Sequence, residues 1–296
     1  MTGIEPASLV WKTKALPLSY IPENGRSPGH CLTYCTRFAG PSPPGDEGAS
    51  FSYGRWMQFT TLWLARHGES VANVAATAAE NSRLETIDVD FRDADVPLSA
   101  LGERQADALG SWLREAGAPA AVWSSPYLRA RQTATRAVER SALDLPVVVD
   151  ERLRDRELGI LDLLTSHGVE ARYPGEAGRR RWLGKYYYRP PGGESWADVS
   201  LRLRSVLTEN RDRDDGPLLV VAHDAIVILL LAVLTGMTEQ EILDFTRANT
   251  VANASVTTLV LRDGEWVVEG FSSVEHLAEL DVPITRHPGD DDVQPQ

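Results

Sequence analysis

The chain has 296 residues and a formal net charge of −12 at pH 7, and 43% of its residues are hydrophobic. This length and composition predict one large domain with an apolar core. The negative charge disfavours nucleic-acid binding, and no stretch approaches the roughly 18 apolar residues of a membrane span. We therefore expect neither a nucleic-acid nor a membrane partner, while the oligomeric state is not indicated.

Residues 1–56 differ in composition from the rest of the chain. They hold 7 of the 18 prolines, 7 of the 23 glycines and both cysteines, Cys31 and Cys35. Because they lack helical or strand periodicity, we expect a disordered leader or a misassigned start, with translation beginning at Met57. No charged start precedes an apolar run, so a secretory signal is not predicted. A cytoplasmic location with two free thiols is expected, and a local disulfide is the alternative.

The first expected strand, 60–66, ends in the sequence Arg66-His67-Gly68-Glu69-Ser70. Gly68 allows the backbone to turn and to approach a ligand closely. A neutral imidazole is a nucleophile, and a guanidinium is a fork suited to phosphate oxygens. Arg66 and His67 therefore predict phosphoryl transfer to histidine at the carboxyl end of a strand. The alternative is a structural histidine beside an incidental arginine.

A helix is expected over 68–80. Ser70 and Asn73 would either bind phosphate or substrate, or cap this helix. Residues 81–97 are polar and are expected to form a loop, which could lie over the site. Ser99 then caps a helix that reaches about residue 116.

The next strand, 120–124, precedes Ser125 and Pro126, a helix-start signal for a helix over 126–140. Arg129 lies in the first turn of that helix, near its positive end, where phosphate binding is favoured.

A strand over 146–150 leads to an acidic stretch that contains Asp155 and Glu157. Residues 160–194 follow as a long insertion, and long loops of this kind are often lids or specificity elements.

A second histidine, His223, ends the apolar strand expected over 218–223. The other elements of this half are helices over 195–210, 225–235 and 239–247 and a hairpin over 256–271. This alternation predicts an α/β domain, a three-layer α/β/α sandwich with a mostly parallel central sheet.

Taken together, these motifs resemble those of the histidine phosphatase superfamily, the phosphoglycerate-mutase-like group. The resemblance covers about residues 57–275 and rests on 66–70 with Asn73, 97–102 with Gln105 and Ala106, 125–133, Ala222 with His223, and 253–257. Asp224 departs from the family pattern, which usually has Gly after the second histidine. Asp155 stands where many relatives have the acidic Glu, four residues before Gly159. Residues 184–199 are similar to a phosphatase-like branch.

The resemblance implies a metal-independent phosphomonoester hydrolase that forms a phosphohistidine on His67. Arg66, Arg129 and a protonated His223 would hold the phosphate oxygens. Asp155 would protonate the leaving group, with Glu157 as the fallback, and such an acid predicts activity below neutral pH.

The expected substrate is a small phosphorylated molecule, and we predict neither a cofactor nor a metal. The catalytic domain is expected over 57–284, followed by a disordered acidic tail over 285–296. Two alternatives stay open. One is a cofactor-dependent phosphoglycerate mutase that uses the same His67, and the other is a non-catalytic phospho-ligand binding module.

Overall fold

The computed structural model describes residues 59–209 and 216–287. The expected leader 1–56, with Cys31, Cys35 and the proposed start at Met57, lies outside the described residues, as does the tail after His287.

A six-stranded sheet, in the order β3-β2-β4-β1-β5-β6, forms the centre of the described domain. Its strands are β1 (Thr61–Arg66), β2 (Ala121–Ser124), β3 (Val147–Val149), β4 (Pro217–Ala222), β5 (Val256–Arg262) and β6 (Glu265–Ser273). The first four strands pair in parallel, whereas β5 pairs antiparallel with both β1 and β6. The predicted mixed α/β fold with a mostly parallel sheet is confirmed.

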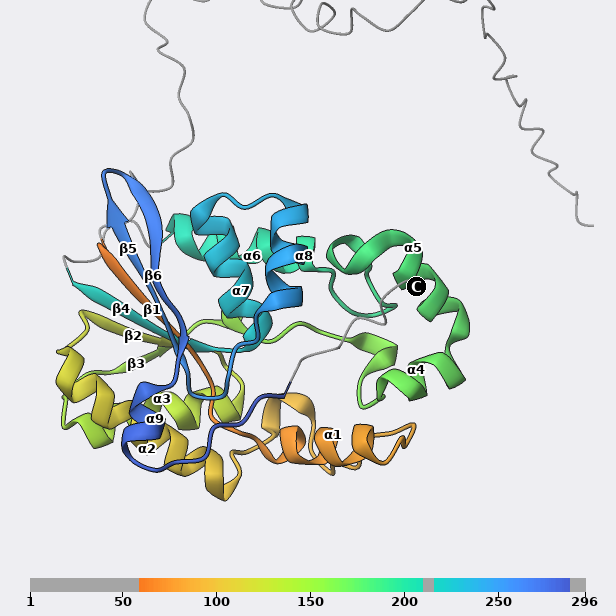
Figure 1. Ribbon diagram of the computed structural model, residues 1–296, viewed down its shortest axis with the longest axis horizontal. Coiled ribbons are helices and arrows are strands. Elements are labelled where there is room, and N and C mark those ends of the chain that lie inside the picture. Colours follow the sequence, from red (N-terminus) through yellow and green to blue (C-terminus); the bar gives the residue numbers. More distant parts are fainter. Residues whose placement is uncertain (1–58, 210–215, 288–296) are drawn as a thin grey trace, which may run out of the picture. The chain divides into compact units, whose positions relative to one another are not determined.

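Helices cover both faces of the sheet (Figure 1). The helices of the described residues are α1 (Val71–Asn81), α2 (Ala100–Ala116), α3 (Leu128–Ser141), α4 (Ser166–Arg172), α5 (Pro174–Tyr187), α6 (Trp196–Glu209), α7 (Asp224–Thr235), α8 (Glu239–Ala248) and α9 (Glu275–Glu279), of which α2 and α3 cover one face of the sheet and α6 and α7 the other. Short 3-10 turns η2 (Asp93–Asp95), η3 (Glu151–Leu153) and η4 (Gly159–Leu161) lie between them.

The core has two layers, one on each face of the sheet, and the side chains of β1 point alternately into them. Leu62 and Leu64 pack in the cluster with residues of α6 and α7, whereas Trp63 and Ala65 pack with residues of α2 and α3. Successive side chains of a strand point to opposite faces, so each central strand contributes to both layers. The rigid sheet thereby holds the ends of its strands at fixed positions.

The first helix starts later than predicted. Ser70 accepts a hydrogen bond from the backbone N–H of Asn73, and the Asn73 side chain accepts one from the backbone N–H of Ser70. This capping box starts α1 at Val71. Gly68 is left in a non-helical segment that lies so close to α2 that an added Cβ would meet the Gly102 carbonyl oxygen at 2.5 Å.

The expectation of a long loop over 160–194 is wrong, because this segment contains α4 and α5. Thr165 caps α4 by accepting from the backbone N–H of Gly168, and Pro174 occupies the first position of α5, where proline is favoured. In Figure 1 both helices lie beyond the carboxyl ends of the parallel strands. Both helix-start signals are present in the sequence, but the segment has too few apolar residues to show a helical periodicity.

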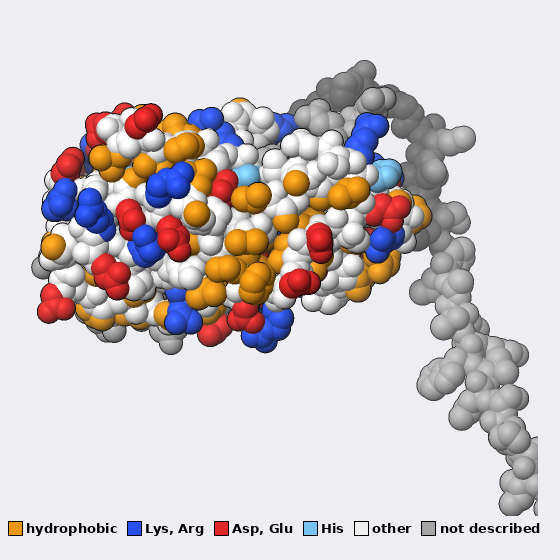
Figure 2. Space-filling model, turned by 90° about the horizontal axis from the view of Figure 1, so that it is seen from below, with side chains coloured by type: hydrophobic (Ala, Val, Ile, Leu, Met, Phe, Trp, Pro, Cys, Tyr) orange, Lys and Arg blue, Asp and Glu red, His pale blue; other side chains and the backbone are white. Residues whose placement is uncertain are grey.

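Acidic and basic side chains are interspersed on the face seen in Figure 2, with apolar side chains between them. The most apolar helix, α7, is buried in the core. Among the described residues, no helix combines the length and apolar character needed to cross a bilayer.

Candidate active site

Two adjacent parallel strands bring the two histidines together. β1 and β4 pair so that Arg66 lies opposite Ala222, and His67 and His223 are the residues that follow them. Their ring centroids are 5.1 Å apart, and both side chains are buried. The predicted meeting of strand ends is therefore present in the structure.

The tautomer of His67 follows from one hydrogen bond. Its Nδ1 lies 2.7 Å from the carbonyl oxygen of Gly68, and because a carbonyl can only accept, Nδ1 carries the proton. Nε2 keeps its lone pair and accepts from Nε of Arg129 at 3.3 Å. Burial, together with the charges of Arg129, His223 and Arg66, holds the pKa of His67 well below its usual range. His67 is thus a neutral imidazole with Nε2 available for attack.

Arg129 lies in the first turn of α3, as predicted, and is buried. Its Nη2 pairs with Oδ2 of Asp155 at 3.0 Å. Its Nη1 donates to Oδ1 and to the carbonyl oxygen of Asp93, at 2.8 and 2.6 Å. The three nitrogens of this guanidinium thus contact His67, Asp93 and Asp155, so Arg129 lies beside the nucleophile and is flanked by two carboxylates.

His223 is held by a hydroxyl that precedes α3. Its Nε2 lies 2.8 Å from Oγ of Ser125. Its Nδ1 lies 3.1 Å from Oδ2 of Asp155, but the contact is not aligned as a hydrogen bond, and this buried nitrogen has no hydrogen-bond partner among the described residues. A buried ring nitrogen without a hydrogen-bond partner is rare in proteins, and Nδ1 is therefore a group that a ligand can engage.

The two candidate acids differ in position. Asp155 contacts both Arg129 and His223, whereas Glu157 accepts a hydrogen bond from the hydroxyl of Tyr127 at 2.9 Å. Burial by itself would raise the pKa of Asp155, but the charges of His223 and Arg129 outweigh it and hold that pKa well below its usual range. The geometry therefore favours Asp155 over the fallback Glu157.

The loop that carries Asp155 is braced from α6. Arg202 donates to the backbone carbonyl oxygen of Asp155 at 3.0 Å and pairs with Glu194. Glu194 also pairs with Arg154 at 2.7 Å. These contacts hold the carboxyl of Asp155 beside the two histidines.

Arg66 is buried below the histidines. Its Nη1 donates to the carbonyl oxygen of Val251 at 2.6 Å and its Nη2 to that of His287 at 3.1 Å. Its Nε is buried without a hydrogen-bond partner among residues 59–209 and 216–287. We call Arg66, His67, Arg129 and His223 the cationic floor, a name that refers to its two arginines, since His67 is neutral. In it Arg66 contributes positive charge, while its Nη atoms bind backbone carbonyl oxygens.

The structure places Ser70 and Asn73 in the cap of α1, the alternative left open by the sequence. Their side chains complete each other's backbone hydrogen bonds, and Oδ1 of Asn73 also accepts from the side chain of Asn253 at 3.4 Å. Contact of either residue with substrate stays a prediction.

Sequence reasoning missed Asp93 and the segment before His287. Thr285 bonds to Asn253 and Gln105, and His287 lies 3.2 Å from Glu69, so the domain extends past its predicted end at residue 284. No periodic pattern marks this segment. Asp93 lies in the expected loop over the site, but several acidic residues occur there and none stands out by spacing.

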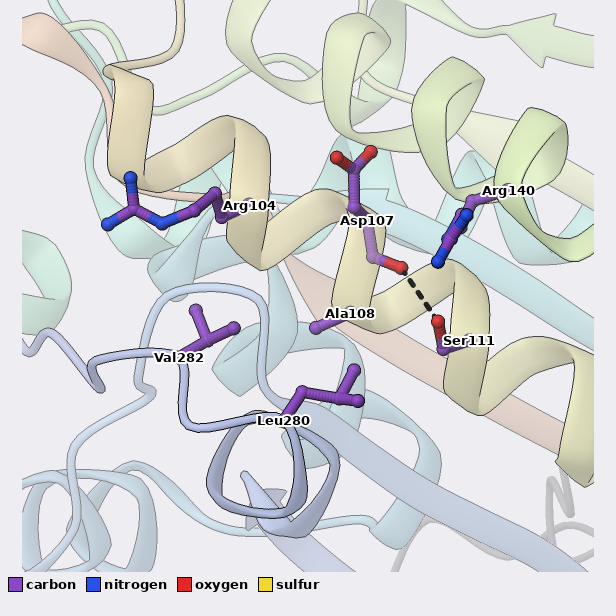
Figure 3. Close-up of a pocket in the computed structure, with 7 residues that line it drawn as sticks. All are labelled: Arg104, Asp107, Ala108, Ser111, Arg140, Leu280 and Val282. Carbon is purple, nitrogen blue, oxygen red and sulfur yellow. Dashed lines mark hydrogen bonds between the residues drawn. The ribbon is translucent and has the colours of Figure 1, made fainter.

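No group of three or more His, Cys, Asp or Glu residues is arranged to hold a metal ion in the described part of the chain. A cavity of about 150 Å³ lies elsewhere, between α2, Arg140 of α3 and the segment after α9 (Figure 3). Leu280 and Val282 face Ala108 and Ser111 across it, and it contains no residue of the cationic floor.

Comparison with known proteins shows which family this chain matches. The model of the histidine phosphatase superfamily (branch 1) matches residues 62–273. A Yersinia enterocolitica protein named "Probable phosphoglycerate mutase GpmB" is 30% identical over 228 residues, which cover 75% of this chain and 95% of that protein. A Caenorhabditis elegans 6-phosphofructo-2-kinase/fructose-2,6-bisphosphatase is 32% identical over 173 residues, 58% of this chain. The match spans 33% of that relative, so the chain corresponds to about a third of its length.

Solved structures show the same fold. A mycobacterial glucosyl-3-phosphoglycerate phosphatase is 30% identical, with a TM-score of 0.57 over 72% of this chain and 99% of its own. Bacillus stearothermophilus YhfR is 29% identical, with a TM-score of 0.58 over 74% of this chain and 99% of its own.

Proposed function

The chain belongs to the histidine phosphatase superfamily, and from that premise we propose that it is a phosphomonoester hydrolase acting through a phosphohistidine on His67. One observation carries the proposal. A buried, neutral imidazole presents Nε2 to the guanidinium of Arg129, with His223 and Asp155 next to it. Nucleophile, charge and acid thus converge on one position.

The first step transfers the phosphoryl group to His67. Nε2 attacks phosphorus as the bond to the leaving oxygen breaks, and Asp155 donates a proton to that oxygen. Arg129 and His223 stabilise the charge on the equatorial oxygens. The proton stays on Nδ1, which donates to the Gly68 carbonyl oxygen, so the phosphorylated ring is cationic and remains a good leaving group.

The second step returns the phosphoryl group to water. Asp155, now ionised, takes a proton from the water as its oxygen bonds to phosphorus, and the bond between Nε2 and phosphorus breaks. Inorganic phosphate is released and both residues regain their starting states. The positive charge comes from side chains throughout, and no step requires a metal ion.

The resting charge of Asp155 shapes the first step. Its lowered pKa means that it is ionised before substrate binds. A bound phosphate takes over the contacts that Arg129 and His223 make with this carboxylate, and loss of those contacts raises its proton affinity. Asp155 therefore takes up a proton from solvent as substrate binds, and it returns that proton to solvent once phosphate has left and the contacts with Arg129 and His223 form again.

Phosphoglycerate mutase activity is the second candidate. It is favoured by the name of the Yersinia relative, 95% of whose length is covered by the match to this chain. It would use the same His67 and return the phosphoryl group to a second substrate instead of water. A small phosphorylated substrate belongs to both candidates. The cytoplasmic location remains a prediction from the sequence.

The test is phosphate release from phenyl phosphate by the full chain between acid and neutral pH, with and without EDTA, beside a 3-phosphoglycerate mutase assay. We expect release that EDTA does not reduce, together with little mutase turnover. Mutase turnover with little release would favour the second candidate. Absence of both would contradict the proposal.

A further inference from the structure

Asp93 lies inside the candidate active site without a part in the chemistry described above. Its carboxylate is 2.8 Å from Nη1 of Arg129, on the other branch of the fork from Asp155. Its backbone carbonyl oxygen accepts from the same Nη1 at 2.6 Å. The 3-10 turn η2 therefore places a second carboxylate on the guanidinium that is proposed to bind phosphate.

Two further carboxylates lie within electrostatic range of Asp93 and of the groups around it. Glu157 accepts a hydrogen bond from the hydroxyl of Tyr127, whose ring meets that of His223 edge-to-face and lies under the guanidinium of Arg129. Burial, the charge of Asp93 and the hydrogen bond to Glu157 all raise the pKa of Tyr127. Partial burial and then the charges of Asp93 and Glu157 raise the pKa of Asp162, which follows η4. We call Asp93, Glu157 and Asp162 the acidic rim.

In-line transfer puts the leaving group on the side of phosphorus opposite Nε2 of His67, so Asp155, as the proposed acid, must lie on that side. Asp93 binds the same guanidinium as Asp155, which places the nearest member of the acidic rim beside the leaving group. An anionic substituent on the leaving group would be repelled by these carboxylates. Within the described residues, Arg129 is the one arginine of the cationic floor that contacts them. A carboxylate can instead accept a hydrogen bond from a hydroxyl group.

Resting on the phosphatase activity proposed above, we propose that Asp93 is a specificity-determining residue. With Glu157 and Asp162, it makes the enzyme discriminate against phosphomonoesters whose leaving group carries a second anionic group. Such rejection by like charge is a common source of specificity. The preferred substrates are then monoesters of uncharged or cationic alcohols, and 3-phosphoglycerate is a poor substrate.

The experiment compares kcat/KM for phenyl phosphate and 4-carboxyphenyl phosphate in the full-length wild type and in Asp93→Asn. The asparagine keeps the shape of the side chain and removes its charge. We expect the ratio of the two values to shift toward the carboxylated ester by about three- to tenfold, because solvent partly screens a carboxylate that is 37% exposed. A ratio equal to that of the wild type would overturn the proposal.

Asp95→Asn is the matched control, since Asp95 lies in the same turn but pairs with Arg92 at 2.5 Å. It should leave the ratio unchanged. Asp162→Asn, at an exposed position, repeats the test should Asp93→Asn fail to fold, and a smaller shift in the same direction is expected. If the wild type hydrolyses neither ester, the proposed phosphatase activity fails; hydrolysis with an unmoved ratio refutes only the role of Asp93.

Discussion

The cationic floor and the acidic rim meet at Arg129, but they are built in different ways. Two of the floor residues, His67 and His223, directly follow central strands that pair in parallel, and Arg129 lies in the first turn of a helix packed on the sheet. The rim residues lie in or beside short 3-10 turns, and none of them is fully buried. The side chains that we propose carry out phosphoryl transfer thus reside on rigid elements, while the turns carry the charges that we propose distinguish substrates.

Removing the nucleophile tests the floor most severely. His67→Ala should lower kcat by about 10⁴-fold or more and prevent formation of a phosphoenzyme, because no other described group has the geometry of Nε2. His167→Ala, at an exposed position of α4, is the control and should leave kcat unchanged. Turnover retained in His67→Ala would refute the mechanism.

Asp155, the proposed acid, contacts Arg129 and His223 of the cationic floor, and Arg129 also contacts Asp93 of the acidic rim. Replacing Asp155 therefore tests how the two regions act together. Asp155→Asn should slow hydrolysis of alkyl phosphates by about 10²- to 10³-fold and that of p-nitrophenyl phosphate far less, since a good leaving group needs no proton. Steady-state rates for both esters measure this difference. Glu157→Gln is the matched variant, and the opposite ranking of the two variants would move the acid to Glu157.

Two glycines with different surroundings test how tightly the segment after β1, which leads into the cationic floor, packs against α2. An added Cβ on Gly102 would lie 1.9 Å from the carbonyl oxygen of Glu69, whereas one on Gly178 of α5 would meet no atom within 4 Å. Gly102→Ala should lower the free energy of unfolding by about 2–4 kcal/mol through overpacking. Gly178→Ala should raise it by up to about 1 kcal/mol because alanine favours helix.

Denaturant unfolding of the full chain measures both changes. Equal effects of the two alanine substitutions would show that the segment after β1 is not constrained by α2 in the way the structure indicates.

The pH dependence should be the mildest effect. Because the pKa of His67 is lowered, the nucleophile stays neutral as the pH falls below 6.5, and it does not limit the rate there. Because the pKa of Asp155 is also lowered, the carboxyl is almost wholly ionised near neutral pH, and its small protonated fraction grows as the pH falls. For an alkyl phosphate, kcat/KM should therefore rise by about several-fold from neutral toward acid pH.

In Asp155→Asn, kcat/KM should not rise in this way, because the variant has no carboxyl to protonate. A fall in kcat/KM of the wild type toward acid pH would show instead that His67 becomes protonated.

Much of the floor could be predicted from the sequence, for a physical reason. His67 and His223 follow apolar runs that read as buried strands, and the carboxyl ends of parallel strands meet at one edge of a sheet. Arg129 follows a helix-start signal. The strand, helix and hairpin order was recoverable from the same patterns, and the main error was the segment that contains α4 and α5.

The rim could not be predicted, because it depends on how irregular segments fold back. Asp93 and Asp95 lie two residues apart in one polar stretch, yet one contacts Arg129 and the other Arg92. Ser125 was expected only as a helix start, and its bond to Nε2 of His223 became visible only with β2 and β4 side by side. The bond from Arg66 to His287 joins residues 221 positions apart, and no local pattern anticipates it.

The most direct measurement is rapid acid-free quenching of the full chain during turnover of phenyl phosphate, followed by mapping of the phosphorylated peptide by mass spectrometry. We predict phosphate on His67, with no phosphate on His223 and none in His67→Ala. Label on another residue, or full turnover without any phosphorylated His67 in the steady state and in single-turnover samples, would contradict it.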